Sequence, residues 1–314
     1  MAIGTDIRQA AQLLRRGRLV AIPTETVYGL AANAFDAEAV LGIFEAKQRP
    51  AFDPLIVHVG DRAQVKDVVR DLPDEAQALM ERFWPGPLTL VLPKAAQVPD
   101  IVTSGLDTVG IRMPAHPMAL ELLRGLPFPL AAPSANPFGY VSPTTAQHVA
   151  DQLRDRVPYI LDGGACAVGV ESTIIGQENG EWVLYRPGGL AVDAIEAVIG
   201  RVGRAQQHVL PVAPGLLESH YAPHKPLHVG NVPELLRSFN DRRVAVISCS
   251  TIYQAWRCER LSPSGDMHEA ARHLFAVLRA LDASEAEVIL AEVFPDEGLG
   301  AAINDRLRRA SAKR

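Results

Sequence analysis

Hydroxyl, carboxylate and cationic side chains recur in this sequence at the points where short apolar runs end. The apolar run LVAI at residues 19–22 stops at Pro23, and Thr24, Glu25 and Thr26 follow it directly. A short apolar run that ends at a proline predicts a buried strand with an abrupt end. Two interpretations of the polar residues stay open: hydroxyls that satisfy backbone groups in a strand-to-helix turn, or a ligand site at a strand end.

Four cationic side chains stand where they could bind anions. Lys47 and Arg49 lie before Pro50 at the predicted end of a helix, where cations either compensate the helix dipole or bind a phosphate chain. Arg112 interrupts the apolar segment TVGIRMP, so its guanidinium needs a structural salt bridge or a ligand carboxylate held by two hydrogen bonds. Arg186 precedes a proline turn, where it either pairs with a carboxylate or faces a ligand.

Further polar residues follow the same pattern. His58 lies inside the apolar run LIVHV, as a satisfied core group or as a ligand contact. Ser134 and Ser142 lie between prolines in APSANPFGYVSPTT, as turn and cap residues or as contacts to an anion or a ribose. Ser172 stands where the run STII begins, and HYAP at residues 220–223 interrupts a proline-rich stretch. Because polar groups recur at so many strand ends, we predict one polar cleft lined by several loops.

Several common catalytic signatures are absent from the sequence. It has no GxxxxGK[ST] phosphate loop, no GxSxG nucleophile motif and no HExxH zinc motif. His220 and His224 flank Pro223, so we do not expect them to share a helix face as zinc ligands. We therefore expect neither a covalent nucleophile nor a resident metal. GLGAA at residues 298–302 is half a dinucleotide fingerprint and is predicted to begin a packed helix.

Composition restricts the class of protein. The 314 residues fit two domains, and 48% hydrophobic with 21% charged residues is typical of a folded soluble protein. A net charge of −5 argues against a protein whose main role is to coat nucleic acid. We find no signal peptide and no membrane-spanning apolar run, and three scattered cysteines suit a reducing cytoplasm.

The elements that must position these residues are short and irregularly connected. Helices are predicted at residues 6–16, 36–47, 62–69, 74–83, 116–126, 143–153 and 190–199, and strands at 19–22, 55–59, 84–93, 108–114, 129–135 and 159–164, followed by a hairpin around Asn179-Gly180. This order predicts an α/β fold of the α+β type, with a mixed sheet and helices on both faces. We predict a first domain at 1–203, a proline-rich linker at 204–228 and a small α/β domain at 229–314, with strands at 242–248 and 287–294 and helices at 267–281 and 301–310.

An ordered set of motifs resembles a known family. PTETVYGL, the KxRP segment before PLIVH, FWPGPLTLVL, TVGIRMP, APSAN with SPT, GVESTII and RPG resemble, in this order, the threonylcarbamoyl-AMP synthases of the YrdC-like family. The resemblance covers residues 7–199, and SHYAP followed by a small domain with GLGAAINDRL resembles the long form of these enzymes. It implies a YrdC-like twisted mixed sheet and a Rossmann-like C-terminal domain.

The resemblance also implies a reaction. The family makes threonylcarbamoyl-adenylate from L-threonine, bicarbonate and ATP, releases pyrophosphate, and supplies tRNA threonylcarbamoyladenosine modification in the cytoplasm. Mg²⁺ is expected with ATP, and downstream threonylcarbamoyl-transfer proteins are expected partners. The threonine amine takes up CO2, and a carbamate oxygen attacks the α-phosphate. Carbamates decompose readily, so a closed and dry site suits this chemistry.

Site residues are carried over from the resemblance by position. The implied L-threonine contacts are Thr26, His58, Arg112, the backbone of Ala132, and Ser172. The implied ATP contacts are Lys47, Arg49, Asp53, Thr108, Ser134, Ser142, Arg186 and Tyr221. Arg112 would hold the threonine carboxylate with Glu25 as support, and Tyr221 would be a lid over the nucleotide with His220 beside it. Asp53 departs from the usual Asn, and its carboxylate would repel phosphates unless it binds Mg²⁺ or turns away.

Two other functions compete with this interpretation. A relative of the same fold could handle carbamoyl-adenylate in hydrogenase maturation, although the long form argues against it. An RNA-binding module is the rival of a different class, and the tail RLRRASAKR at residues 306–314 would then add weak tRNA contact. The alternative for that tail is a solvated helix end with a favourable dipole.

Overall fold

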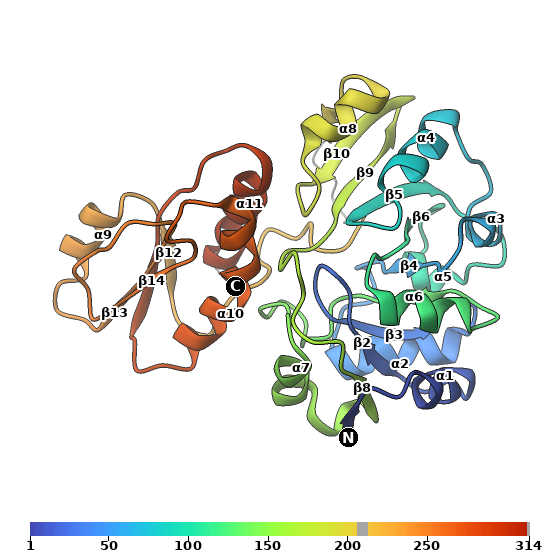
Figure 1. Ribbon diagram of the computed structural model, residues 1–314, viewed down its shortest axis with the longest axis horizontal. Coiled ribbons are helices and arrows are strands. Elements are labelled where there is room, and N and C mark those ends of the chain that lie inside the picture. Colours follow the sequence, from blue (N-terminus) through green and yellow to red (C-terminus); the bar gives the residue numbers. More distant parts are fainter. Residues whose placement is uncertain (206–212, 313–314) are drawn as a thin grey trace.

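The computed structural model describes residues 1–205 and 213–312 and contains two separate β-sheets (Figure 1). The larger sheet has the strand order β1-β8-β2-β3-β7-β4-β6-β5-β9-β10-β11 and mixes parallel with antiparallel pairs, as predicted. Its strands are β1 (Ala2–Gly4), β2 (Val20–Ile22), β3 (Gly29–Asn33), β4 (Ile56–His58), β5 (Leu88–Pro93), β6 (Thr108–Arg112), β7 (Leu130–Ala131), β8 (Tyr159–Leu161), β9 (Thr173–Glu178), β10 (Glu181–Arg186) and β11 (Gly203–Arg204).

Helices pack on this sheet largely where the apolar periodicity placed them. They are α1 (Ile7–Arg15), α2 (Ala37–Lys47), α3 (Val65–Val68), α4 (Asp74–Phe83), α5 (Asp100–Thr103), α6 (Pro117–Arg124), α7 (Ala146–Leu153) and α8 (Val192–Ile199), with 3₁₀ turns at Arg62–Gln64 and Arg154–Arg156. Asp6 and Asp36 cap α1 and α2, since each carboxylate accepts two backbone N–H bonds. The predicted helix at 62–69 is a 3₁₀ turn followed by α3, and α7 begins later than predicted because Thr145 is its N-cap.

The prediction missed several short elements: β1, β3, β11 and α5 here, and in the C-terminal unit the strands Leu227–Val229 and Arg257–Arg260 and the helix Val232–Ser238. Of these, β3 bears directly on the site. Residues 29–33 form β3, which pairs antiparallel with both β2 and β7, so residues 23–28 connect two antiparallel strands rather than a strand and a helix. The segment GLAAN has little intrinsic strand preference, and its neighbours in the sheet impose the extended conformation. The predicted hairpin at Asn179-Gly180 is confirmed: β9 and β10 pair antiparallel, and both turn residues have positive φ.

The smaller sheet is entirely parallel, with the order β12-β15-β13-β14. Its elements are β12 (Leu227–Val229), α9 (Val232–Ser238), β13 (Val244–Ser248), β14 (Arg257–Arg260), α10 (Met267–Asp282), β15 (Val288–Ala291) and α11 (Gly298–Ser311). This arrangement confirms the predicted Rossmann-like unit. GLGAA begins α11, as predicted, and Gly300 is required there because a Cβ would lie 2.0 Å from the carbonyl oxygen of Pro295.

Helices α10 and α11 lie on the side of the small sheet that faces the large sheet (Figure 1). Their apolar faces share one buried cluster with Val27, Val141 and Val170 from loops of the larger sheet and with Tyr221. The segment that leads from one sheet to the other is therefore packed between them where it is described. In the described ranges, no helix is long and apolar enough to cross a membrane.

Candidate functional site

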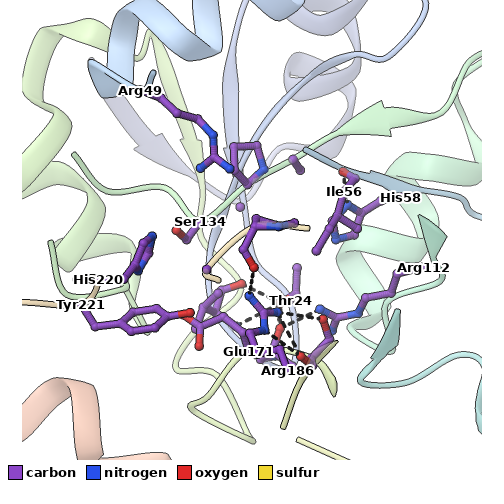
Figure 2. Close-up of a pocket in the computed structure, with 18 residues that line it drawn as sticks. Thr24, Arg49, Ile56, His58, Arg112, Ser134, Glu171, Arg186, His220 and Tyr221 are labelled. Atoms are coloured by element: carbon purple, nitrogen blue, oxygen red, sulfur yellow. Dashed lines mark hydrogen bonds between the residues drawn. The ribbon is translucent and has the colours of Figure 1, made fainter. Parts of the chain in front are cut away.

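A small cavity lies where loops at the ends of the large-sheet strands meet residues 214–221 (Figure 2). The free space inside it is about 50 Å³. Nine predicted site residues line it: Thr26, Arg49, His58, Arg112, Ala132, Ser134, Ser172, Arg186 and Tyr221. Four predicted residues do not: Lys47, Asp53, Thr108 and Ser142. The expected single cleft lined by several loops is thus present, and it is nearly filled by the protein itself.

Arg112 organises one end of the cavity. It ends β6 and lies in register with His58 of β4, so the sheet itself brings these two side chains together. The guanidinium donates to Thr26 Oγ1 at 2.9 Å and to the carbonyl oxygen of Gly86 at 3.2 Å. Its Nη2 forms an ion pair with Glu25 Oε1 at 2.6 Å. A buried, oriented guanidinium of this kind suits a carboxylate ligand.

The two interpretations of the PTET segment apply to different residues. Thr24 Oγ1 donates to the carbonyl oxygen of Val27 at 2.6 Å and accepts the backbone N–H groups of Thr26 and Val27. Thr24 therefore satisfies the turn, as in an ST motif. Thr26 and Glu25 instead bind Arg112, and Glu25 takes the supporting position expected for it.

His58 is neutral in this environment. Burial and the nearby Arg112 guanidinium lower the pKa of His58 to about 3, against an ordinary value of 6.5. Its Nδ1 lies 3.3 Å from the carbonyl oxygen of Ile56, and the ring lines the cavity. A neutral imidazole beside Arg112 offers hydrogen bonding without adding a second positive charge.

Two further buried guanidinium groups, those of Arg49 and Arg186, line the cavity. Arg49 donates through Nε to the carbonyl oxygen of Asp53 at 2.9 Å and through Nη2 to that of Pro54 at 2.7 Å. Arg186 donates through Nη2 to the carbonyl oxygen of Ser172 at 3.0 Å and through Nη1 to that of Pro214 at 2.8 Å. Burial lowers the pKa of both groups. Two cations in one partly dry cavity favour a polyanionic ligand such as a phosphate chain.

Lys47 lies behind this wall rather than in it. Its ammonium group donates to the carbonyl oxygens of Ser134 and Asn136, and it is almost completely buried. Burial and the neighbouring Arg49 lower the pKa of Lys47 well below its usual value, while Asp53 opposes the shift. In this arrangement Lys47 holds the loop that presents Ser134 to the cavity.

Asp53 is paired with Arg49, which differs from both expected outcomes, Mg²⁺ binding or a turn away from the phosphates. Its Oδ2 lies 2.8 Å from Arg49 Nη2, and the side chain has no exposed surface. Burial raises the pKa of Asp53, although Arg49 and Lys47 oppose that shift. The carboxylate therefore neutralises part of the charge that Arg49 would present to an anion.

We expect Asp53→Asn to lower the KM for ATP by about threefold, because it removes a buried negative charge beside Arg49. The difference from wild type should shrink as the pH is lowered, since the raised pKa of Asp53 lets the carboxyl protonate earlier and resemble Asn. Steady-state kinetics over a pH series measures this effect, with the exposed Asp241→Asn as a control. A raised KM at neutral pH would show instead that the ion pair is needed to position Arg49.

Thr108 and Ser142 stand apart from the cavity in different ways. Thr108 begins β6, pairs with Pro93, and lies at the opposite end of the strand from Arg112. Ser142 donates to Glu171 Oε1 at 2.5 Å, and Glu171 lines the cavity. Ser142 thus acts on the cavity through Glu171, whereas no described contact of Thr108 reaches it.

Glu171 and Gly215 are among the lining residues that were not predicted from the sequence. Glu171 directly precedes Ser172 in GVESTII, so its place beside a predicted site residue was the available signal. Gly215 has a φ of +76°, and a Cβ there would lie 2.4 Å from Tyr221 Oη and 2.8 Å from Arg186 Nη1. Only glycine lets the chain approach these two side chains so closely.

The basic tail is largely buried, which corrects the expectation of a solvated helix end. Arg306 has no exposed surface and pairs with Glu171, and Arg309 donates to the carbonyl oxygens of Leu216 and Leu217. Of the tail arginines in α11, Arg308 is the exposed one, at 73% of its side chain. Arg306 and Arg309 are thus unavailable for tRNA contact because intramolecular partners hold them, and residues 313–314 lie outside the described residues.

Within the described ranges, no group of three or more His, Cys, Asp or Glu side chains could hold a metal ion. Glu25 and Asp53, the carboxylates beside the cavity cations, are already in ion pairs with Arg112 and Arg49. The donor set of this chain therefore provides anion-binding groups rather than a metal-ligand cluster.

Comparisons with known proteins extend over nearly the whole chain. A family model described as "Telomere recombination" matches residues 12–188, and one described as "Threonylcarbamoyl-AMP synthase, C-terminal domain" matches residues 190–312. The chain is 46% identical to the threonylcarbamoyl-AMP synthase of Pyrococcus abyssi, with 98% of this chain and 94% of that protein covered. It is 44% identical to the protein of that name in Bacillus subtilis, with the same coverage. The crystal structure of P. abyssi Sua5 complexed with L-threonine has a TM-score of 0.95 at 44% identity, covering 99% of this chain and 98% of that chain.

Proposed function

The chain belongs to the threonylcarbamoyl-AMP synthase family, and we propose that it forms threonylcarbamoyl-AMP and pyrophosphate from L-threonine, bicarbonate and ATP. The observation that carries the proposal is a cavity lined both by Arg112, a guanidinium that suits a carboxylate, and by the cations Arg49 and Arg186, which suit phosphates. We assign the amino acid to a first end at Arg112 and the nucleotide to a second end at Arg49 and Arg186, so that the two substrates would meet within one cavity, as adenylation requires.

At the first end, L-threonine would bind through its carboxylate to Arg112. Glu25 and Thr26 hold that guanidinium in place, so little side-chain order is lost on binding. His58, the backbone of Ala132 and the Ser172 hydroxyl would complete the site. The likeness to the crystal structure of P. abyssi Sua5 complexed with L-threonine supports this assignment.

At the second end, the phosphates of ATP would bind to Arg49 and Arg186, with Ser134 as a further contact. Lys47 would act indirectly, by holding the Ser134 loop, and Ser142 would act through Glu171. Thr108 and Asp53 remain predicted ATP contacts, and their positions outside the cavity lining give them no direct support. Tyr221 and His220 would cover the nucleotide.

The reaction needs positioning and charge rather than a nucleophilic side chain. Bicarbonate takes up a proton and loses water to give CO2, and the neutral threonine amine adds to CO2 and releases a proton to give a carbamate. A carbamate oxygen then attacks the α-phosphorus. The bond from that phosphorus to the bridging oxygen of the β-phosphate breaks, and pyrophosphate leaves. The buried cations would stabilise the charge that develops on the phosphates. Exclusion of water would protect the carbamate and the mixed anhydride.

The cavity volume implies a lid. Its free space of about 50 Å³ is far below the range of roughly 300–1,000 Å³ found for ligand pockets. Pro214, Gly215, His220 and Tyr221 supply much of the inner wall, and Arg186 is bound to the Pro214 carbonyl. We therefore propose that residues 214–221 move outward to admit ATP and close again over it.

Other features of the proposal rest on the chemistry of the reaction. Mg²⁺ would arrive bound to the phosphates of ATP, because the carboxylates near the cavity are in ion pairs. The product would pass to tRNA threonylcarbamoyl-transfer proteins in the cytoplasm. We also propose the division into a catalytic domain at 1–203, a linker at 204–228 and a C-terminal domain at 229–314, in line with the two separate sheets.

Pyrophosphate release by the purified protein with MgATP tests the function. We expect release that requires both L-threonine and bicarbonate, since the attacking carbamate needs both. Release that depends on carbamoyl phosphate instead would favour a carbamoyl-handling relative. Salt-dependent tRNA binding without ATP turnover would favour an RNA-binding module.

A further inference from the structure

Among the residues that the structure describes, Arg306 has the largest fully buried side chain, and its contacts reach from one unit to the other. It belongs to α11 beside the small sheet and has no exposed surface. Its Nε donates to Glu171 Oε2 at 2.7 Å, and its Nη1 donates to the carbonyl oxygen of Pro187 at 2.8 Å. These two partners flank residues of the proposed active site, Ser172 and Arg186. Nη1 also donates to Asp305 Oδ2 at 2.8 Å, a carboxylate that Arg308 and Arg309 bind as well.

Glu171 links Arg306 to the cavity. Its second oxygen, Oε1, accepts from Ser142 Oγ at 2.5 Å, so one carboxylate joins Ser142 on one side to Arg306 on the other. Burial alone would raise the pKa of Glu171, but Arg306 and Arg186 outweigh burial and hold it below the ordinary value. The carboxylate is therefore charged, and Arg306 is the guanidinium in direct contact with it.

Arg306 also supports the segment that covers the cavity. Its guanidinium lies over the Tyr221 ring, 5.2 Å from the centroid, in cation–π geometry. Three residues further along α11, Arg309 binds the carbonyl oxygens of Leu216 and Leu217 and accepts the N–H of His220 on its own carbonyl. Helix α11 thus holds residues 216–221 in the closed arrangement at several points.

The charge balance explains why this contact matters for a nucleotide. Without Arg306, Glu171 would be a buried carboxylate whose nearest compensating cation is Arg186 on the cavity wall. A carboxylate that turns to Arg186 occupies the cation proposed to bind phosphate, and it repels the phosphates as well. Loss of Arg306 would therefore weaken nucleotide binding. It would change threonine binding less, because Arg112, the proposed threonine contact, is paired with Glu25 and not with Glu171.

We propose that Arg306 of the C-terminal unit is a positioning residue of the active site, which holds Glu171 away from Arg186 and supports Tyr221 where it covers the nucleotide. The proposal rests on the proposed function, since it assigns the nucleotide to the end of the cavity lined by Arg186. It also gives the C-terminal unit a direct part in the reaction. Helix α11 thus supports residues that line the cavity in which the ligand would bind.

The test compares Arg306→Met with Arg306→Met/Glu171→Gln in the full-length protein. We expect Arg306→Met to raise the KM for ATP about tenfold or more, as for the loss of one partner of a buried ion pair, and to change the KM for L-threonine less than about twofold. In the double variant residue 171 no longer carries an unpaired charge. Its KM for ATP should therefore be lower than that of Arg306→Met by about threefold or more. The matched control is Arg308→Met on the same helix, whose exposed ion pair contributes little.

The outcomes separate positioning from mere structural support. Equal losses in both substrates without rescue by Glu171→Gln, or an unchanged KM for ATP in Arg306→Met, would overturn the proposal. If Arg306→Met does not fold, Arg306→Gln keeps a hydrogen-bond donor near Glu171 but removes the compensating charge, and a wild-type KM for ATP in that variant would overturn the proposal. Direct titration with a non-hydrolysable ATP analogue separates failure of the proposed function from failure of the Arg306 inference. If the wild type binds no nucleotide, both are refuted. If wild type and Arg306→Met bind the analogue equally, only the Arg306 inference is refuted.

Discussion

Replacing Arg112 with alanine is expected to weaken L-threonine binding by about a hundredfold or more and to leave ATP binding within about twofold. Arg112 is buried at one end of the cavity, and Glu25 and Thr26 hold its guanidinium in place. Its removal would take away the bidentate partner of the substrate carboxylate. It would also leave the buried Glu25 carboxylate unpaired, which repels a second carboxylate.

Calorimetric titration with L-threonine and, separately, with an ATP analogue measures both affinities. Arg112→Ala/Glu25→Gln removes the stranded charge, so it separates loss of the contact from repulsion by Glu25. If the contact dominates, the double variant still binds threonine poorly. Arg70→Ala, at an exposed surface ion pair, is the control. Threonine affinity that survives in Arg112→Ala would place the substrate carboxylate elsewhere in the cavity.

Arg186→Met is expected to produce the complementary result, a loss of ATP affinity of about thirtyfold or more. Arg186 is buried and lines the cavity, and it binds the carbonyl oxygens of Ser172 and Pro214. Methionine keeps most of the volume but supplies no charge and no N–H donor. Threonine affinity should fall only a few-fold, through the shared contact with Ser172.

The same pair of titrations measures this effect, and Arg82→Met, at an exposed position of α4, controls for the loss of an arginine. Circular dichroism and urea unfolding show whether the variant is folded, since Arg186 also binds backbone carbonyls. A folded Arg186→Met with wild-type ATP affinity would remove the phosphates from this end of the cavity. Together with Arg112→Ala, the experiment tests whether the two ends of one cavity serve different substrates.

The elements that the sequence predicted correctly are those with strong local signals. The Asp6 and Asp36 caps begin their helices where the carboxylates can accept backbone N–H groups, and Asn179-Gly180 supplies the two positive φ angles of the hairpin. Most of the site was predictable for a related reason. A strand end is marked locally, by an apolar run followed by polar residues, and the ordered motifs placed Thr26, Arg112 and their neighbours at such ends.

The predictions that failed concern residues whose conformation or burial depends on partners distant in the sequence. The Ala- and Gly-rich β3 is a strand because β2 and β7 pair with it, and its own residues carry only a weak strand preference. The tail arginine Arg306 looked like part of a solvated helix end, yet it is buried because Glu171, 135 positions earlier in the chain, accepts its hydrogen bond. A charge is stable in the interior only when a partner compensates it.

The sequence by itself therefore determined the two-unit α/β architecture, the family and most of the residues that face the cavity, because each depends on patterns within a few positions of the chain. Only the tertiary structure decided which partner each charge takes. It paired Glu25 with Arg112, Asp53 with Arg49 and Glu171 with Arg306, and it placed Lys47 behind the cavity wall. Electrostatic partners are chosen by distance in space and by burial, and neither is encoded in the local order of residues.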